Sequence, residues 1–159
     1  MNATTTRGLV LFAALLVLGA VNYSIYGKEE TIRTGDVVYL ELAPVDPRSL
    51  MQGDYMALRF RLAEHIESAR ANSTFGATVR SAPLSLDSRR VATLAAGDAA
   101  LRMGYRIRGG TVWLGTNAYF FAEGSAQRYS QARYGEFRIN PVSGDAVLVG
   151  LADEALNRL

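Results

Sequence analysis

An uncharged and mostly apolar run, GLVLFAALLVLGAVNYSI, occupies residues 8–25 near the start of the chain. A helix of eighteen residues spans about 27 Å at 1.5 Å per residue, which is close to the hydrocarbon thickness of a bilayer. Tyr23 and Tyr26 fall where aromatic side chains gather at membrane interfaces, and Lys28 ends the uncharged run. We therefore expect residues 1–27 to form a transmembrane anchor that contacts lipid through residues 8–25.

A cleaved signal peptide is the alternative, because Arg7 followed by an apolar stretch also resembles such a leader. Cleavage after Ala20 would place Leu18 where a small residue is wanted, which favours a retained anchor. Arg7 precedes the helix, whereas Lys28 is followed by two glutamates. The positive-inside rule then gives a mild preference for an N-terminus in the cytoplasm and a C-terminal domain outside it.

About 130 residues follow the anchor, which is enough chain for one domain with a buried core. The formal net charge is only +2, and the arginines are scattered among acidic residues rather than clustered. Nucleic-acid binding is therefore not expected. The absence of cysteine excludes disulfides, thiolate metal sites and cysteine nucleophiles.

Hydrophobic patterning predicts a mainly β domain over residues 36–159, α+β at the margin, joined to the anchor by a charged linker at 28–35. Strands are expected at 37–42 and 55–62, with a helix at 63–71. Two short strands are expected within 84–94, and 137–139 should pair with 146–149. Residues 101–114 predict a hairpin around Gly109-Gly110, and Asp46-Pro47 predicts the start of a short helical turn.

The chain also shows an internal echo at an offset of 79 residues. Residues 39–60 align without a gap with residues 118–139, and both stretches read as strand, short helical segment and strand. This pattern predicts two pseudo-symmetric units within the domain, although two strands with a common pattern would give a similar match. The identical positions are Ala43 and Ala122, Gln52 and Gln131, Tyr55 and Tyr134, and Arg59 and Arg138.

The stretch GDYMALRF at residues 53–60 resembles the name motif of the bacterial GDYXXLXY family, with Phe60 where the final Tyr is expected. The resemblance continues through PVDPRSL, RGGTVWLG, YFFAEG, RYSQARYGEFRI and LVGL, over most of residues 36–152. It implies a small membrane-anchored protein, often encoded beside a polytopic membrane protein, and it brings no catalytic residues. The residues assigned to structural motifs are Asp46, Pro47, Gly53, Asp54, Leu58, Phe60, Glu123 and Gly124.

Three enzymatic alternatives find little support. Ser49 and Lys28 could form a signal-peptidase-like pair, but Lys28 lies hard against the membrane helix and ahead of the serine. A Ser-His-Asp triad would need His65, the sole histidine, which falls on an expected amphipathic helix. Carboxylates at Asp46, Asp54 and Glu123 could bind a hard cation, but their spacing matches no known loop. We predict no catalytic residues, cofactor or metal.

Arginines and aromatic residues supply the candidates for binding. Arg102, Arg106 and Arg108 share one face of the predicted hairpin, either as a solvent-facing row that discourages edge pairing or as an anion-binding strip. Residues 119–121, Tyr-Phe-Phe, must point alternately to two sides of a strand. The candidate contact residues are Tyr55, Arg59, Tyr134, Arg138, Trp113 and Phe120.

These features favour a non-enzymatic accessory subunit of the bacterial cytoplasmic membrane, with a single membrane pass and an extracytoplasmic C-terminal domain. Its expected partner is a polytopic membrane protein, and the sequence leaves open whether the chain also forms homo-oligomers. The alternative is a periplasmic binding module for a small or envelope-derived ligand held between the two units. A hydrolase of unrecognised type comes third.

Overall fold

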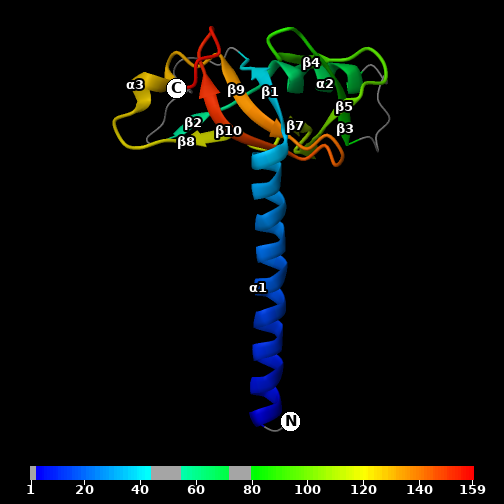
Figure 1. Cartoon of the computed structure of the whole chain (residues 1–159), viewed down its shortest axis with the longest axis vertical. Coiled ribbons are helices and arrows are strands. Elements are labelled where there is room, and N and C mark those ends of the chain that lie inside the picture. The colour runs from blue at the N-terminus through cyan, green and yellow to red at the C-terminus, as the bar shows by residue number, and fades with distance from the viewer. Residues whose placement is uncertain (1–2, 44–54, 72–79) are drawn as a thin grey trace.

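The computed structural model describes residues 3–43, 55–71 and 80–159 of the chain. A long helix, α1 (Ala3–Thr34), projects from a domain formed by the residues that follow it (Figure 1). The domain sits at the C-terminal end of α1, so the helix stands clear of it along most of its length. The architecture is therefore a stalk that carries a folded head.

Helix α1 is long and apolar enough to cross a membrane, because its most apolar eighteen-residue stretch has a mean hydropathy of 2.1 and none of that stretch is buried. The charged segment expected as a linker is helical instead, since α1 continues without a break to Thr34. Arg33 donates to Glu30 at 2.7 Å and Thr31 donates to the carbonyl of Gly27 at 3.0 Å. Such contacts between residues three and four apart support a helix, which explains why α1 continues through the segment that joins the apolar stretch to the domain.

A three-stranded antiparallel sheet forms the centre of the domain, in the order β1 (Asp36–Glu41), β9 (Tyr134–Ile139) and β10 (Ala146–Ala152). Strands β9 and β10 pair across the turn at residues 140–145, as the sequence predicted. Strand β1 matches the strand expected at residues 37–42 and follows directly from α1. Contacts of α1 with β9 and β10 join the stalk to this sheet.

Three smaller antiparallel sheets and two short helices complete the described part of the domain. Because helices and strands both contribute to it, the chain is mixed α+β rather than mainly β. The remaining strands are β2 (Tyr55–Ala57) with β8 (Ala118–Phe120), β3 (Ser81–Leu86) between β4 (Ala92–Leu94) and β5 (Leu101–Gly104), and β6 (Arg106–Arg108) with β7 (Thr111–Trp113). The helices are α2 (Arg61–Ala71) and α3 (Ala126–Tyr129).

The strand expected at residues 55–62 is shorter in the structure. It ends at Ala57, and α2 begins at Arg61, two residues before the helix predicted there. Phe60 forms only an isolated bridge with Leu42. The alternating burial is nevertheless as predicted through Phe60, while Leu62 is buried from the first turn of α2 rather than from a strand.

The predicted hairpin also forms, in a shorter version. Gly109 and Gly110 both have positive φ angles, 57° and 83°, and join β6 to β7. However, β5 pairs with β3 rather than with β7, because the chain changes sheet at Tyr105, whose N–H donates to the carbonyl of Arg80. The arginine row expected from the sequence is divided as a result, and Arg102 belongs to a different sheet from Arg106 and Arg108.

Two of the ladders reproduce the 79-residue offset of the sequence. Adding 79 to the number of a β1 residue and subtracting 79 from the number of its β9 partner gives a residue pair of the β8–β2 ladder. One further pair extends the match. Val38 lies opposite Phe137, and their counterparts Asn117 and Leu58 are joined by a hydrogen bond of 2.7 Å from the Leu58 N–H to the Asn117 carbonyl. The matched pairs are Tyr39–Glu136 with Ala118–Ala57, Leu40–Gly135 with Tyr119–Met56, and Glu41–Tyr134 with Phe120–Tyr55.

One hydrophobic core connects the helices and strands of the domain that follow α1. Its centre lies on the three-stranded sheet, where Phe60 packs edge-on against Phe137 with ring centroids 5.3 Å apart. Buried residues of α2 cover one side of it. The largest fully buried side chains are Phe137, Leu40, Ile66, Met103, Leu114, Ile139, Leu151 and Val38.

Candidate functional site

A pocket of about 600 Å³ opens beside the last turns of α1, and we call it the basal pocket. Its walls come from the end of α1, the segment before β3, the β5–β6 junction, β7 and the start of β10. In Figure 1 these elements meet where the stalk enters the head. The lining residues are Lys28, Arg80, Gly104, Tyr105, Arg106, Arg108, Trp113, Gly115, Thr116, Asn117, Gly144, Asp145, Ala146, Val147 and Leu148.

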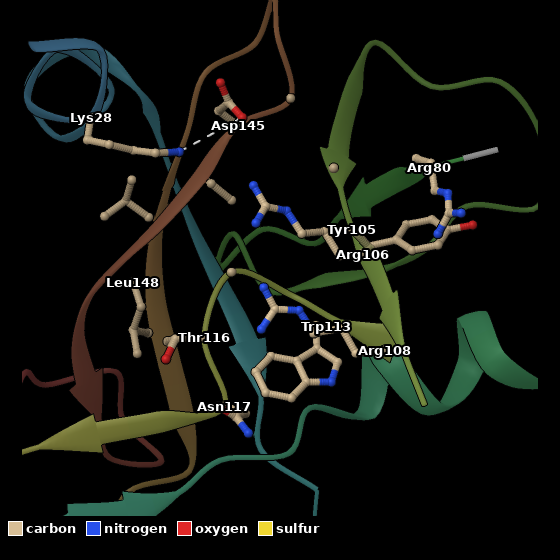
Figure 2. A pocket seen from close by; sticks show the side chains of 15 residues that line it. Lys28, Arg80, Tyr105, Arg106, Arg108, Trp113, Thr116, Asn117, Asp145 and Leu148 are labelled. Atoms are coloured by element: carbon tan, nitrogen blue, oxygen red, sulfur yellow. Dashed lines mark ion pairs between the residues drawn. The ribbon is translucent and has the colours of Figure 1, made fainter. Parts of the chain in front are cut away.

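Strand β6 supplies two of the cations. Side chains alternate along a strand, so Arg106 and Arg108 share one face while Ile107 points to the other and packs against the core. The Arg108 guanidinium lies 4.9 Å from the ring centroid of Trp113 on the neighbouring strand, within cation–π distance. Figure 2 shows Lys28, Arg106 and Arg108 converging on one space.

Helix α2 holds this hairpin in place. The Glu67 carboxylate accepts a hydrogen bond of 2.7 Å from the Val112 N–H on β7. Arg70 donates to the Tyr105 hydroxyl at 3.2 Å, and Tyr105 is itself a buried wall of the pocket. Because α2 is anchored in the core, these contacts give the strand that carries Arg106 and Arg108 a fixed position.

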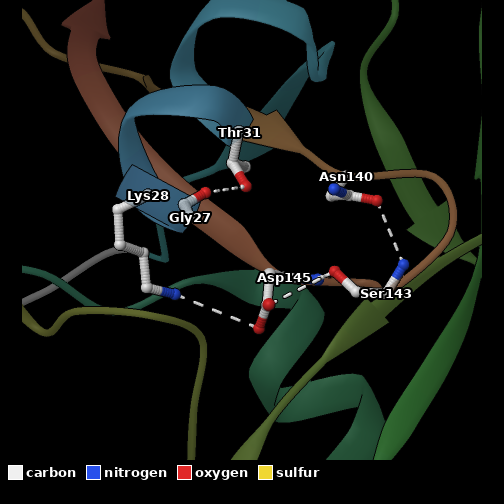
Figure 3. Close-up of polar contacts among 6 residues, drawn as sticks. All are labelled: Gly27, Lys28, Thr31, Asn140, Ser143 and Asp145. Carbon is white, nitrogen blue, oxygen red and sulfur yellow. Dashed lines mark hydrogen bonds and ion pairs between the residues drawn. The ribbon is translucent and has the colours of Figure 1, made fainter. Parts of the chain in front are cut away.

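The turn between β9 and β10 forms the opposite wall (Figure 3). The Asn140 side chain accepts hydrogen bonds from the N–H groups of Val142 and Ser143, at 2.9 and 3.1 Å. Gly144 has a φ of 73°, and a Cβ there would lie 3.1 Å from the carbonyl oxygen of Arg102. Only glycine combines this left-handed backbone with so close an approach, so the turn can press against β5.

Lys28 connects the stalk to the pocket. Its Nζ lies 4.0 Å from Asp145 Oδ1, with the two side chains 53% and 64% exposed (Figures 2 and 3). An exposed pair at this distance contributes little to stability. The burial of Thr31, one turn further along α1, fixes the helix end against the head instead. The Lys28 ammonium therefore lies among the groups that line the pocket, and its ion pair with Asp145 is weak.

The basal pocket is cationic. Four of its lining side chains carry a positive charge, namely Lys28, Arg80, Arg106 and Arg108, while Asp145 is the one acid among the described residues that line it. Guanidinium groups bind carboxylates and phosphates through paired hydrogen bonds. A concave site with several cations and one aromatic face has the chemistry of an anion-binding site.

A second pocket of about 440 Å³ lies on the other side of β7. It shares Arg108, Trp113, Thr116 and Asn117 with the basal pocket, so this stretch forms a partition between the two. Its charge is mixed, because Arg59 and Arg108 face Glu64 and Glu67.

The four residues predicted to line a site between the two units do not come together in either of the two pockets described above. Tyr55 is half-buried on β2, and Arg59 lines the second pocket. Tyr134 lies under the Arg89 guanidinium, 5.7 Å from ring centroid to carbon, while Arg138 donates to the Gly35 carbonyl at 3.3 Å. Neither pocket described above contains Tyr55, Tyr134 or Arg138, and their role in contacts stays a prediction.

The aromatic cluster divides as the strand alternation predicted. Phe120 is 73% exposed and its ring lies 5.7 Å from that of Tyr55. On the other side, Tyr119 and Phe121 both pack against Tyr129 of α3. Burial, followed by a hydrogen bond with Tyr129, raises the pKa of Tyr119. Phe120 is thus the aromatic side chain of this group that is available to a partner.

The remaining candidates carry no site in the described residues. Leu58 and Phe60 are buried in the core, and His65 lies exposed on α2. Glu123 and Gly124 form an exposed turn before α3. The other motif and enzymatic candidates, Asp46, Pro47, Ser49, Gly53 and Asp54, lie outside the described residues.

Sequence reasoning missed most of the basal pocket. Arg106 and Arg108 were placed with Arg102 on one face, either as a solvent-facing row or as an anion-binding strip, and Lys28, Arg80 and Asp145 were not considered as partners for them. One local signal was available. Arg106 and Arg108 are two positions apart, as residues on one face of a strand are, and they lie close in the chain to Trp113, the sole tryptophan. Nothing in the sequence places α1 and the β9–β10 turn beside that strand.

Comparison with known proteins gives one match. Searches of curated proteins and of solved structures found none. A family model described as GDYXXLXY protein matches residues 17–151, from the middle of α1 into β10. The chain therefore belongs to the GDYXXLXY protein family.

Proposed function

We propose that this protein is a non-enzymatic accessory subunit anchored in the bacterial cytoplasmic membrane by α1, with its domain on the extracytoplasmic side. The observation that carries the proposal is the state of α1, whose apolar side chains are exposed along its whole membrane-length stretch. Leu11, Leu15 and Leu18 are all more than half exposed. Such a surface is stable in lipid or against other transmembrane helices, not in water.

A polytopic membrane protein is the partner that fits this arrangement. Family resemblance implies an association with such proteins, and a single-pass helix can pack against their helices. Phe120 offers a further contact, because a largely exposed aromatic ring beside the half-buried Tyr55 is typical of protein interfaces.

The two-unit organisation belongs to the same proposal. The matching registers of the β1–β9 and β8–β2 ladders support an internal repeat in which each unit lends its first strand to the second strand of the other. α3 occupies the helical segment of the second unit. This exchange would make the domain a single rigid body, suited to hold a partner in a fixed orientation.

Photo-crosslinking in native membranes tests the proposal. A photoreactive residue at Leu11 or Leu15 should give an adduct with one polytopic protein, and so should one at Phe120. Gln127, which is exposed on α3, serves as the control position and should give none. Recovery of the uncrosslinked chain alone from all these positions would reject the accessory role.

Orientation can be tested separately, because the chain contains no cysteine. A single cysteine at the exposed Ser88 should react with a membrane-impermeant thiol reagent in spheroplasts, whereas one at Thr5 should react only after lysis. The opposite labelling would place the domain in the cytoplasm.

A periplasmic binding module is the second candidate function. The basal pocket favours it, since an accessory role alone does not require a concave site with four cations.

A further inference from the structure

We propose that the basal pocket binds the phosphate-bearing headgroup of an anionic phospholipid from the membrane in which α1 is anchored. The proposal requires the membrane location of α1 and otherwise goes beyond the accessory role. Its basis is the juxtaposition of Lys28 at the end of the anchor with Arg106 and Arg108 on β6.

The height of the pocket above the bilayer is the first argument. The mostly apolar stretch of α1 ends at Ile25, and Lys28 lies three residues, or about 4.5 Å, further along the helix axis. The headgroup layer extends about 5–8 Å beyond the hydrocarbon on each side. Lys28 thus lies within this layer, and the head begins immediately above it, where Thr31 is buried.

The charge of the pocket is the second argument. Lys28, Arg80, Arg106 and Arg108 outnumber Asp145 among the described lining residues. A phosphate offers several acceptor oxygens, which two guanidinium groups on one strand face can bind together. A zwitterionic headgroup would bring its own cation into the same space, so a headgroup with net negative charge is preferred.

The surroundings favour a lipid over a soluble phosphate. Val142, in the turn that also supplies Gly144 and Asp145, is 95% exposed. This turn lies on the side of the head that faces the stalk (Figure 1). An apolar side chain there can enter the interfacial region, and Trp113 is of a residue type that is enriched at that level. A soluble anion would need neither feature.

The test uses the full-length protein in a neutral detergent, titrated with short-chain phosphatidylglycerol. Trp113 is the sole tryptophan and lines the pocket, so its fluorescence reports binding, and native mass spectrometry counts the lipids retained. Phosphatidylglycerol should bind about tenfold or more tightly than phosphatidylcholine, the difference expected from a single charged hydrogen bond. Equal affinity for the two lipids would overturn the proposal.

The double substitution Arg106→Gln with Arg108→Gln should weaken phosphatidylglycerol binding about tenfold or more. Both side chains are exposed, so the fold should persist, and an unchanged unfolding midpoint verifies this. The matched control, Arg61→Gln with Arg128→Gln, removes two exposed arginines outside the pocket and should bind as the parent does. An equal loss in the control would reduce the effect to net charge and reject the site.

Glycerol phosphate and inorganic phosphate form the soluble arm of the experiment. The lipid proposal expects both to compete only weakly, and competition by either at the affinity of the lipid would reject a membrane source. The Arg106 and Arg108 variant should stay in the membrane fraction and keep its crosslinked partner. A parent protein that stays in the membrane fraction but does not bind phosphatidylglycerol therefore contradicts this inference alone, whereas a parent protein absent from the membrane fraction contradicts the proposed function.

Discussion

The β1–β9 and β8–β2 ladders have matching registers and differ in the elements that lie next to them. Strands β1 and β9 form six pairs, and β10 extends their sheet on the other side of β9. Strands β2 and β8 form three pairs, with no third strand among the described residues. The inward face is buried in both ladders, since Phe137 is fully buried and its counterpart Leu58 is 4% exposed, but on the outward face Phe120 is 73% exposed while its counterpart Glu41 is half-buried. A repeated pairing pattern thus fixes which residues face each other, but the neighbouring elements decide how much they bury.

One position shows how the difference is built. Gly135 on β9 corresponds to Met56 on β2 at the 79-residue offset. A Cβ at Gly135 would lie 2.9 Å from Phe60 Cε1 and 3.1 Å from atoms of Leu148 and Phe137. The β1–β9 ladder needs glycine at this position because three side chains converge on β9, whereas the β8–β2 ladder accepts the long side chain of Met56.

The largest expected effect is in the covered ladder. Phe137→Ala should lower the free energy of unfolding by about 3–5 kcal/mol, because it removes a fully buried ring and leaves a cavity. Chemical denaturation of the full-length protein in detergent measures the change. A loss below about 1 kcal/mol would mean that the burial of the β1–β9 ladder does not stabilise the domain.

Gly135→Ala tests the close packing of the β1–β9 ladder by adding a single methyl group to β9. We expect it to destabilise the protein by about 1–3 kcal/mol, since Phe60, Leu148 and Phe137 leave no room for a Cβ. The same denaturation measurement applies. Gly109→Ala is not a suitable control because of its positive φ, whereas Gly97→Ala, with nothing within 4 Å of the new Cβ, is expected to be tolerated.

Phe120→Ala probes the exposed ladder and should cost less than about 1 kcal/mol. Its ring is 73% exposed, and its main contact is the tilted packing against Tyr55 at 5.7 Å. A cost similar to that of Phe137→Ala would remove the distinction between the two ladders. The same variant should weaken crosslinking to the proposed partner, which separates a contact role from a stabilising one.

The smallest effect concerns pH at the turn after β10, next to the covered ladder. Hydrogen bonds from the side chain and backbone of Asn157 lower the pKa of Asp153. The resulting stabilisation is present above the ordinary pKa of an aspartate and is lost as the pH falls through the lowered value of the folded state. The protection factors of the Ala155 and Asn157 amides against hydrogen exchange should therefore fall below about pH 4. In Asp153→Asn this pH dependence should disappear, and its persistence would point to another group.

Local sequence patterns predicted several elements well. The turn at Gly109-Gly110, the pairing of β9 with β10 and the helix at residues 63–71 all follow from residues close together in the chain. The errors occurred where neighbours in space decide the outcome. Tyr105 ends a strand that the pattern would continue, because its backbone pairs with Arg80 instead of with the hairpin.

The candidate site was predictable only in fragments. Trp113 was identified as one of the aromatic candidates for contact, and an anion-binding strip was considered for Arg106 and Arg108 together with Arg102. The structure retains the last two arginines, directs Arg102 toward Asp98 and Ser81, and adds Lys28 from the stalk. No periodic pattern in the sequence could predict this group of lining residues, since they belong to elements that meet only after folding.

The sequence by itself determined the length of the apolar stretch in α1, the family of the chain and the offset that relates the two ladders. Each of these depends on the order and chemistry of consecutive residues. Only the tertiary structure decided that each ladder joins the two halves of the chain and that Lys28, Arg106 and Asp145 surround one pocket. The physical reason is that a local pattern sets which face of an element is apolar, whereas the choice of its neighbour depends on the packing of the whole core.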